Sequence, residues 1–259
     1  MPTASVNGQK IYYEDSGGSG PAVIFSHGFL MDHEMFAPQV AELCDEFRCI
    51  TWDERGFGQT AATSPFNYYD SAADCLAVLE HLGIEQAVLA GMSQGGFLSL
   101  RAALTAPGRV KALVLIDTES GAEDPSTLEA YDAMQNEWLT NGPVNVQDAI
   151  AGLILGGGVD PTPWFKKWED LPRDGFRHAY DCLVHRDDIT GRLPEITCPA
   201  MIVHGDEDQA IVMAKAEALR DGLGNCDQLV VVKGAAHAAN LSHPEQVNPP
   251  LREFLRKHA

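Results

Sequence analysis

The feature that most constrains how this chain can fold is the stretch AVLAGMSQGGFLSLRAAL at residues 87–104. An apolar run over residues 87–90 is typical of a buried strand. Beyond it, apolar residues recur close to a helical period of 3.6, at Phe97, Leu98, Leu100, Ala103 and Leu104. Ser93 lies where the two patterns meet, so the chain has to turn from a strand into a helix at this serine.

Glycines surround Ser93 at the predicted turn. Side chains at Gly91, Gly95 or Gly96 would collide with the adjoining strand or helix, so glycine permits the sharp reversal. Such a joint, the nucleophile elbow Gly-x-Ser-x-Gly, exposes a serine hydroxyl at the sheet edge and aims a helix N-terminus at it, which favours a developing anion. A serine between glycines also marks ordinary turns and helix caps, so a catalytic Ser93 needs support from the rest of the chain.

Short apolar segments alternate with helical segments along most of the chain. Expected strands are AVIFSHG, FRCITWD, AVLAGMS, ALVLIDT, AMIVHGD and QLVVVKG, preceded by a hairpin at NGQKIYYED. Expected helices cover residues 33–43, 69–82, 95–106, 211–222 and 244–258. This repetition predicts an α/β fold with a mostly parallel sheet flanked by helices. Functional residues are then expected just beyond the carboxyl ends of the strands.

Residues 120–190 interrupt this alternation. They contain four stretches with helical spacing and no convincing strand, so we expect a helical cap at 120–190 inserted into a core domain made of residues 1–119 and 191–259. Most aromatic side chains of the cap are expected to pack against one another and against the core. Trp138 and Trp164 are the candidates for lining the entrance to a substrate pocket.

Composition excludes several classes of partner. The length of 259 residues fits one large domain with an insertion. The net charge of −19 argues against nucleic acid, because phosphate binding requires clustered Lys and Arg and the sequence has no such cluster. No apolar run approaches the roughly 20 residues that span a bilayer, so we expect no membrane partner. The N-terminal stretch MPTASVNGQKIYYEDS lacks an apolar signal core, and we expect a cytoplasmic protein.

The spacing of cysteines and histidines gives little support for a metal site. The six cysteines and nine histidines form no Cys-x-x-Cys, His-x-x-x-His or His-Glu-x-x-His pattern. We therefore predict that function requires neither a metal nor another cofactor.

Two further strand ends carry residues that could activate a serine. A serine hydroxyl is a poor nucleophile near neutral pH and needs a base, which in turn needs a group that orients it. The strand in MIVHGDED is followed by Asp206, Glu207 and Asp208, and the strand in VVVKGAAHAAN is followed by His237. The order serine, acid, histidine is that of the nucleophile-elbow hydrolases.

On these residues the chain resembles the α/β-hydrolase fold superfamily over essentially its whole length. The matching stretches are SHGFLMDHEMF, WDERGFGQT, GMSQGG, HGDED and GAAH, in the order of the superfamily. The resemblance implies an eight-stranded sheet and acyl transfer without a cofactor. Within the superfamily, GAAHAANLSHPEQVN is similar to esterases and to enol-lactonases of the 3-oxoadipate type. The stretch DERGFGQT also resembles the cofactor-free perhydrolases and haloperoxidases.

The resemblance also assigns residues to a catalytic triad of Ser93, Asp208 and His237. The pattern Gly-x-x-Asp favours Asp208 as the acid over Asp206, and Asp117 is the alternative because some relatives place the acid after the earlier strand. For the base, we prefer His237 to His243, which precedes a proline at the start of the last expected helix.

The same resemblance places an oxyanion hole at two backbone N–H groups. One belongs to Gln94, directly after the nucleophile, and the other to Phe29, in the loop after the third strand. His27 resembles a structural histidine of the family. Asp53, Arg55 and their neighbours are expected to hold a loop at a strand end by ion pairing.

The sequence thus predicts a serine hydrolase that cleaves a carboxylic ester or lactone of a small to medium, mainly apolar substrate. One alternative is a perhydrolase or haloperoxidase that uses the same triad. A second is a receptor for a small ligand in which the triad is vestigial. We make no prediction of the oligomeric state.

Overall fold

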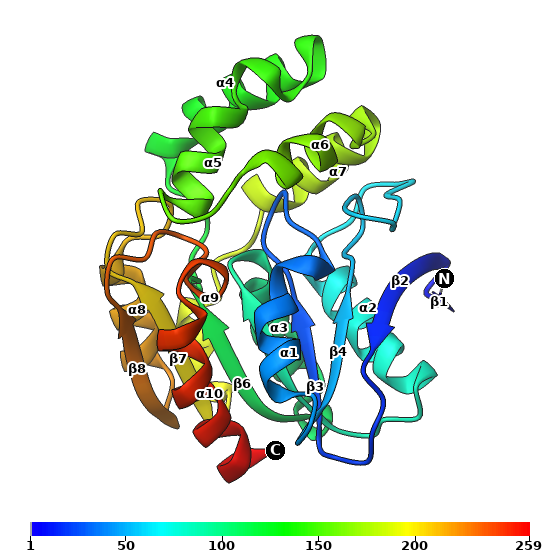
Figure 1. Cartoon of the computed structure of the whole chain (residues 1–259), viewed down its shortest axis with the longest axis vertical. Helices are drawn as coiled ribbons and strands as arrows, with labels where there is room; N and C mark the ends of the chain where they lie inside the picture. The colour runs from blue at the N-terminus through cyan, green and yellow to red at the C-terminus, as the bar shows by residue number, and fades with distance from the viewer. Residues whose placement is uncertain (1) are drawn as a thin grey trace.

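A computed structural model describes residues 2–259 (Figure 1). Within this range, eight strands form one sheet in the order β1-β2-β4-β3-β5-β6-β7-β8. The β1–β2 and β2–β4 pairs are antiparallel and all other neighbours are parallel, which confirms the predicted mostly parallel sheet. The strands are β1 (Thr3–Val6), β2 (Gln9–Asp15), β3 (Ala22–Ser26), β4 (Arg48–Trp52), β5 (Ala87–Met92), β6 (Val110–Ile116), β7 (Ala200–Gly205) and β8 (Cys226–Val232).

Helices cover both faces of the sheet, which explains why its central strands are apolar throughout. In β5, Val88 and Ala90 contribute to one hydrophobic core and Leu89 to the other. Helices α1 and α10 lie in front of the sheet in Figure 1, and α2 and α3 lie behind it. Apart from the helices that lie wholly within residues 120–190, the helices are η1 (His33–Phe36), α1 (Ala37–Leu43), α2 (Tyr68–His81), α3 (Gln94–Thr105), η2 (Pro107–Arg109), η4 (Thr190–Glu195), α8 (Met213–Gly222), α9 (Ala239–Ser242) and α10 (Pro244–His258).

The interval 120–190 is helical, as its sequence spacing predicts. It contains α4 (Pro125–Asn141), η3 (Pro143–Asn145), α5 (Gln147–Leu155), α6 (Thr162–Asp170) and α7 (Arg173–Val184). We call α4 to α7 the cap helices, because they lie together beyond one end of the sheet (Figure 1). The Trp138 ring of α4 stacks on Phe176 of α7, with 4.6 Å between ring centroids, and the Tyr180 hydroxyl donates to Asp132. These contacts hold α4 and α7 together.

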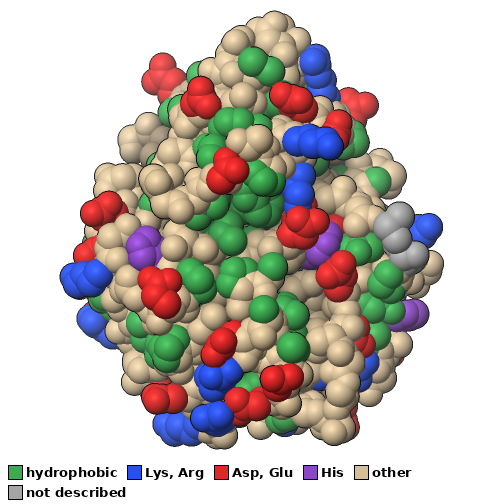
Figure 2. Space-filling model, in the orientation of Figure 1, with side chains coloured by type: hydrophobic (Ala, Val, Ile, Leu, Met, Phe, Trp, Pro, Cys, Tyr) green, Lys and Arg blue, Asp and Glu red, His purple; other side chains and the backbone are tan. Residues whose placement is uncertain are grey.

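The surface carries acidic and basic side chains (Figure 2), as the composition of the sequence leads one to expect. On the face drawn in Figure 2, acidic and basic side chains are interspersed, and apolar side chains gather in the upper half of the view, around the lower part of the cap helices (Figure 1). In the described part of the chain, no helix is both long enough and apolar enough to cross a membrane.

The turn between β5 and α3 has the strained geometry that the glycines around Ser93 predict. Ser93 adopts a φ of 50°, in the left-handed region that costs a residue other than glycine on the order of 1–3 kcal/mol. A Cβ atom at Gly95 would overlap the carbonyl oxygen of Ser26, and one at Gly91 would overlap the backbone of Gly95. Glycine at these positions therefore lets α3 begin directly against the ends of β3 and β5.

We expect Gly95→Ala to lower the free energy of unfolding by about 1–3 kcal/mol or more. This is the usual cost of overpacking, and rigid backbone surrounds the added methyl group. The measurement is the free energy of unfolding from urea titrations. Gly152→Ala is the matched control. Gly152 lies in α5, and apart from its chain neighbours and the backbone of its own helix no atom lies within 4 Å of the added Cβ, so this change should be neutral or stabilising by about 0.4–1 kcal/mol. Equal stability of the two variants would show that the elbow is not tightly packed.

Candidate active site

Ser93 lies directly after the carboxyl end of β5, beside a pocket. Its side chain lines this pocket, although the residue is only 6% exposed. The backbone of Ser93 is fixed from the neighbouring strand: its N–H donates to the carbonyl of Ile116 at 2.9 Å, and the Thr118 hydroxyl donates to the Ser93 carbonyl at 2.8 Å. Residues at the end of β6 therefore hold the elbow in place.

Asp208 and His237 form a hydrogen-bonded pair beside this pocket. Asp208 follows β7 and His237 follows β8, and Asp208 Oδ2 lies 2.8 Å from His237 Nδ1. The other carboxylate oxygen, Oδ1, accepts the backbone N–H groups of Ala210 and Ile211 at 2.8 and 3.0 Å. These bonds fix the carboxylate so that one oxygen faces the imidazole. By contrast, Asp206 is exposed and contacts Lys233 and Gly234.

Each residue of this pair shifts the pKa of the other. Burial acts to lower the pKa of His237, but nearby carboxylates, with Asp208 the strongest, together outweigh burial, so the pKa lies above the ordinary value of about 6.5. Burial acts to raise the pKa of Asp208, but His237 and the backbone donors outweigh it, so the pKa lies below its usual range. The carboxylate thus stays ionised and stabilises a proton on the imidazole.

His237 and Ser93 line the same pocket. Among the described residues, no hydrogen bond joins the Ser93 hydroxyl to the imidazole. Bonds of this kind are often long in proteins without substrate and tighten when substrate binds. The structure therefore brings all three predicted triad residues to one site, with the Asp208–His237 half already formed.

Both residues predicted to supply the oxyanion donors lie near Ser93. Phe29 lines the pocket, and Gln94 is the first residue of α3. Among the backbone hydrogen bonds outside helices and strands of residues 2–259, none has the N–H of Phe29 or Gln94 as its donor, as a free oxyanion donor requires. The Gln94 side chain lies in the core, where its oxygen accepts a weak hydrogen bond from Tyr68 at 3.4 Å.

The pocket is mainly apolar, and most of its walls come from the cap helices and from residues near the elbow. Its lining residues are Gly28, Phe29, Leu30, Met92, Ser93, Phe97, Glu119, Glu123, Tyr131, Met134, Ile150, Leu153, Ile154, Leu183, Arg186, Ala210, Ile211 and His237. A second, more open apolar groove of about 300 Å³ shares Tyr131, Met134, Ile150, Leu153 and Ala210 with it. The two spaces therefore lie next to each other, separated by side chains of α4 and α5 that line both.

The two tryptophans predicted at the pocket lie elsewhere, so this expectation needs correction. Trp138 is 1% exposed and stacks on Phe176 inside the cap. The ring of Trp164 lies under the Lys167 ammonium group, 4.5 Å away. Large aromatic rings bury the most apolar area by packing inside a helical layer, and smaller side chains of α4 and α5 face the pocket instead.

Sequence reasoning missed the charged lining residues Glu119, Glu123 and Arg186. Glu119 comes two residues after Asp117, directly beyond β6, so the rule of strand carboxyl ends could have found it. No local pattern marks Arg186, because its partners are Glu119 and Glu123, more than 60 residues away in sequence.

The alternative candidates have other contacts. Asp117 is fully buried, and its two oxygens accept the N–H groups of Gly205 and Ala239. It thereby ties the strand that leads to Asp208 to the loop that carries His237. Burial, with the nearby Asp208 carboxylate, raises the pKa of Asp117 well above its usual value. His243 lies at the start of α10, where its Nδ1 contacts the Ser242 hydroxyl.

His27 holds a loop beside the site. His27 is fully buried, with Nδ1 at 2.8 Å from the Gly28 carbonyl and Nε2 accepting the Glu54 N–H, and burial lowers its pKa. Its ring is therefore neutral and structural.

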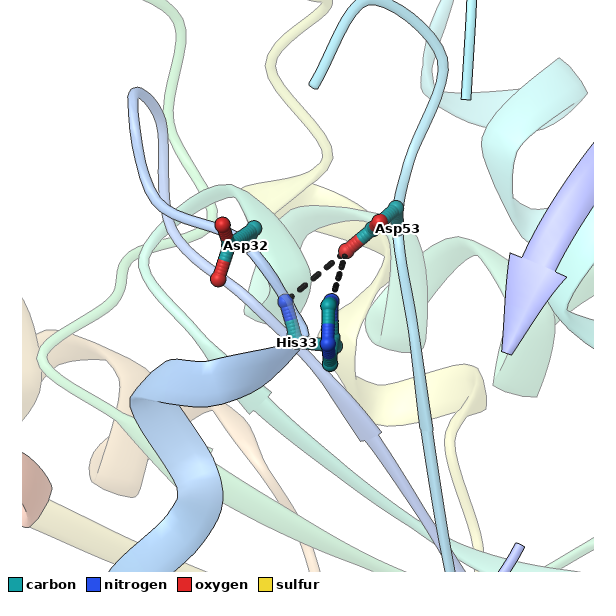
Figure 3. Close-up of side chains that lie close together, drawn as sticks. All are labelled: Asp32, His33 and Asp53. Atoms are coloured by element: carbon teal, nitrogen blue, oxygen red, sulfur yellow. Dashed lines mark hydrogen bonds and ion pairs between the residues drawn. The ribbon is translucent and has the colours of Figure 1, made fainter. Parts of the chain in front are cut away.

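Two groups of acidic and histidine side chains lie close enough together to suggest metal ligands: Asp32, His33 and Asp53, and Asp117, His204 and Asp208. In the first, Asp53 Oδ1 accepts both the backbone N–H and the ring N–H of His33 (Figure 3), and Asp32 pairs with Lys167. In the second, Asp117 and Asp208 accept the backbone and imidazole donors described above, and His204 Nε2 lies 2.8 Å from the Ile211 carbonyl oxygen. Hydrogen bonds within the protein engage the carboxylates of both groups, whereas His204 Nδ1 is buried without a hydrogen-bond partner, 3.7 Å from Asp117 Oδ1. We assign neither group a metal.

Comparisons with known proteins agree with this geometry. A family model described as the alpha/beta hydrolase fold matches residues 21–244. A non-heme haloperoxidase from Rhodococcus erythropolis is 30% identical, with 98% of both chains covered. The 3-oxoadipate enol-lactonase 1 of Acinetobacter baylyi is 26% identical, with 88% of this chain and 86% of the relative covered. The structure of a thermophilic esterase from Thermogutta terrifontis, with malate bound, has a TM-score of 0.89 and 28% identity over 99% of this chain and 97% of that one.

Proposed function

Because the chain belongs to the alpha/beta hydrolase fold family, we propose that it is a serine hydrolase that cleaves a carboxylic ester or lactone through an acyl-enzyme on Ser93. The observation that carries this proposal is the 2.8 Å contact between Asp208 and His237 beside a pocket that also contains Ser93. The esterase and enol-lactonase among the relatives support the reaction class.

The reaction begins when His237 takes the hydroxyl proton of Ser93 as the oxygen attacks the substrate carbonyl. Asp208 holds the imidazole in the required tautomer and stabilises the imidazolium. The backbone N–H groups of Phe29 and Gln94 donate to the oxyanion, and one such donor is worth about 2.7–4 kcal/mol in the transition state. The imidazolium returns its proton to the departing alkoxide, which leaves the acyl-enzyme.

Water completes the cycle. His237 removes a proton from a water molecule, whose oxygen attacks the acyl carbon, and the proton then returns to the Ser93 oxygen as the acid is released. For a lactone, the alcohol formed in the first step stays attached to the acyl group, so a single product leaves. The apolar side chains of α4 and α5 contact the acyl or alkyl part of the substrate and exclude bulk water.

A second candidate reaction uses the same acyl-enzyme with hydrogen peroxide in place of water, which gives a peracid. The 30% identical haloperoxidase favours this candidate, as does the stretch DERGFGQT at residues 53–60. The test compares two rates measured with the same enzyme at the same pH. One is the rate of acetate release from an ester, and the other is the rate of peracid formation from acetate and peroxide. Faster peracid formation would make perhydrolysis the main activity.

The test of the proposed function is a panel of p-nitrophenyl esters and simple lactones of graded size, assayed alongside labelling with a fluorophosphonate. We expect turnover of small to medium neutral esters and stoichiometric labelling of Ser93, located by peptide mass spectrometry. Since a receptor with a vestigial triad would neither turn over esters nor react, absence of both signals in a folded sample would contradict the proposal.

A further inference from the structure

Three charged side chains line the active-site pocket besides the groups of the proposed triad. Glu119 lies just beyond β6, Glu123 lies before α4, and Arg186 lies after α7. Arg186 Nη2 donates to Glu119 at 2.8 Å, and Nη1 donates to Glu123 at 2.7 Å. All three side chains are about nine-tenths buried or more, with exposures of 8%, 11% and 2% respectively.

The Arg186 guanidinium has little capacity left for a ligand. Its Nε donates to the Gly121 carbonyl, and Nη1 donates to the Leu183 carbonyl as well as to Glu123. With the bond to Glu119, four of its five N–H groups are engaged. The group also lies over the Phe97 ring, 4.5 Å from its centroid, so it cannot turn without losing these contacts.

The charge balance of this cluster is negative. Lys215 approaches from the solvent side, where Nζ lies 3.0 Å from Glu119 and 3.2 Å from Asp124, and it is one-third exposed. Three carboxylates, those of Glu119, Glu123 and Asp124, therefore face two cations. The cluster keeps one net negative charge. On the pocket wall itself, Glu119 and Glu123 outnumber Arg186 by two to one. The net charge of −19 on the whole chain adds a field of the same sign.

We propose that Glu119 and Glu123 make this pocket select against substrates that carry a free carboxylate, so that it takes neutral esters or lactones. The inference rests on the proposed function and narrows its substrate class. A carboxylate brought into this pocket would lose its hydration, would find the only lining guanidinium already occupied, and would meet two like charges at low effective dielectric.

The test compares two methyl esters that differ only in charge at the far end of the acyl group, monomethyl succinate and methyl succinamate. At pH 7.5 the first carries a carboxylate and the second an amide of the same shape. We expect kcat/KM to favour the amide by about tenfold or more. Methyl butyrate, which is neutral and apolar, serves as the reference substrate for both.

Substitutions at the acidic residues test the cause of this preference. E119Q and E123Q remove one negative charge each, keep the side-chain shape and leave Arg186 partly unpaired, so each should reduce the preference for the amide several-fold. E129Q is the control, since Glu129 is exposed on α4 and does not line the pocket. Thermal unfolding of each variant verifies that the fold is retained.

The outcomes separate the inference from the function on which it rests. Equal kcat/KM for the two succinyl esters in the wild type, with methyl butyrate hydrolysed, would overturn the inference and leave the proposed function intact. An unchanged preference in both E119Q and E123Q would overturn it as well. If methyl butyrate and every other ester resist hydrolysis, the proposed function fails and the inference fails with it. Should E119Q not fold, E123Q and the wild-type ratio still decide the question.

Discussion

Ser93→Ala is expected to lower kcat for p-nitrophenyl acetate by about 10⁶-fold, the effect seen when a nucleophilic serine is removed from a triad. The variant loses the oxygen that forms the acyl bond, so only the oxyanion donors and substrate binding remain to accelerate hydrolysis. Alanine fits the space of Ser93 and adopts its φ of 50° at a similar cost, so the free energy of unfolding should change little.

Ser99→Ala is the matched control for this result. Ser99 is buried one to two turns further along α3, and its hydroxyl donates to the Gly95 carbonyl, away from the pocket lining. It should keep wild-type activity with a modest loss of stability. Turnover by Ser93→Ala at the wild-type rate, in a sample shown to be free of other esterases, would remove Ser93 from the mechanism.

Asp208→Asn is expected to lower kcat by about 10⁴-fold, because an asparagine amide favours the wrong imidazole tautomer and cannot stabilise the imidazolium. The variant should also change the pH profile. His237 acts as a base only when neutral, so wild-type kcat/KM falls as the pH drops through its pKa, which the Asp208 carboxylate raises. Without that carboxylate, burial dominates, and the residual activity should persist to lower pH than in the wild type.

Asp206→Asn provides the control on the same loop. Asp206 is exposed and contacts Lys233 and Gly234, so its loss should leave both kcat and the acidic limb of the profile unchanged. The assignment of the acid would be wrong if Asp206→Asn lost more activity than Asp208→Asn, or if the acidic limb of Asp208→Asn moved to higher pH.

The parts of the fold that local sequence patterns determine could be predicted from the sequence. The expected helix at 69–82 is α2 (Tyr68–His81), which begins at a capping box formed by Asn67 and Asp70. The three proposed triad residues could be located because each follows an apolar strand, and the carboxyl ends of parallel strands meet at one sheet edge. In this way, short patterns far apart in the sequence place Ser93, Asp208 and His237 together.

The pocket wall depends on contacts between distant residues, and its prediction failed for that reason. Helical spacing identifies an apolar face but not the element that it meets, so Trp138 could equally face substrate or Phe176, and the structure places it on Phe176. Likewise, nothing in the local sequence distinguishes Arg186 from a surface arginine, because its partners Glu119 and Glu123 lie beside it only in the folded chain. These contacts form only when α4 and α7 pack beside the end of β6.

The most direct test of the account is a crystal structure of the wild-type protein after reaction with a fluorophosphonate. Ser93 Oγ displaces fluoride from phosphorus, and the adduct resembles the tetrahedral intermediate of acyl transfer. We expect the phosphonyl oxygen about 2.7–3.1 Å from the backbone nitrogens of Phe29 and Gln94, and His237 Nε2 within hydrogen-bond distance of an adduct oxygen. An adduct on another residue, or a phosphonyl oxygen that faces away from both nitrogens, would contradict the proposed site.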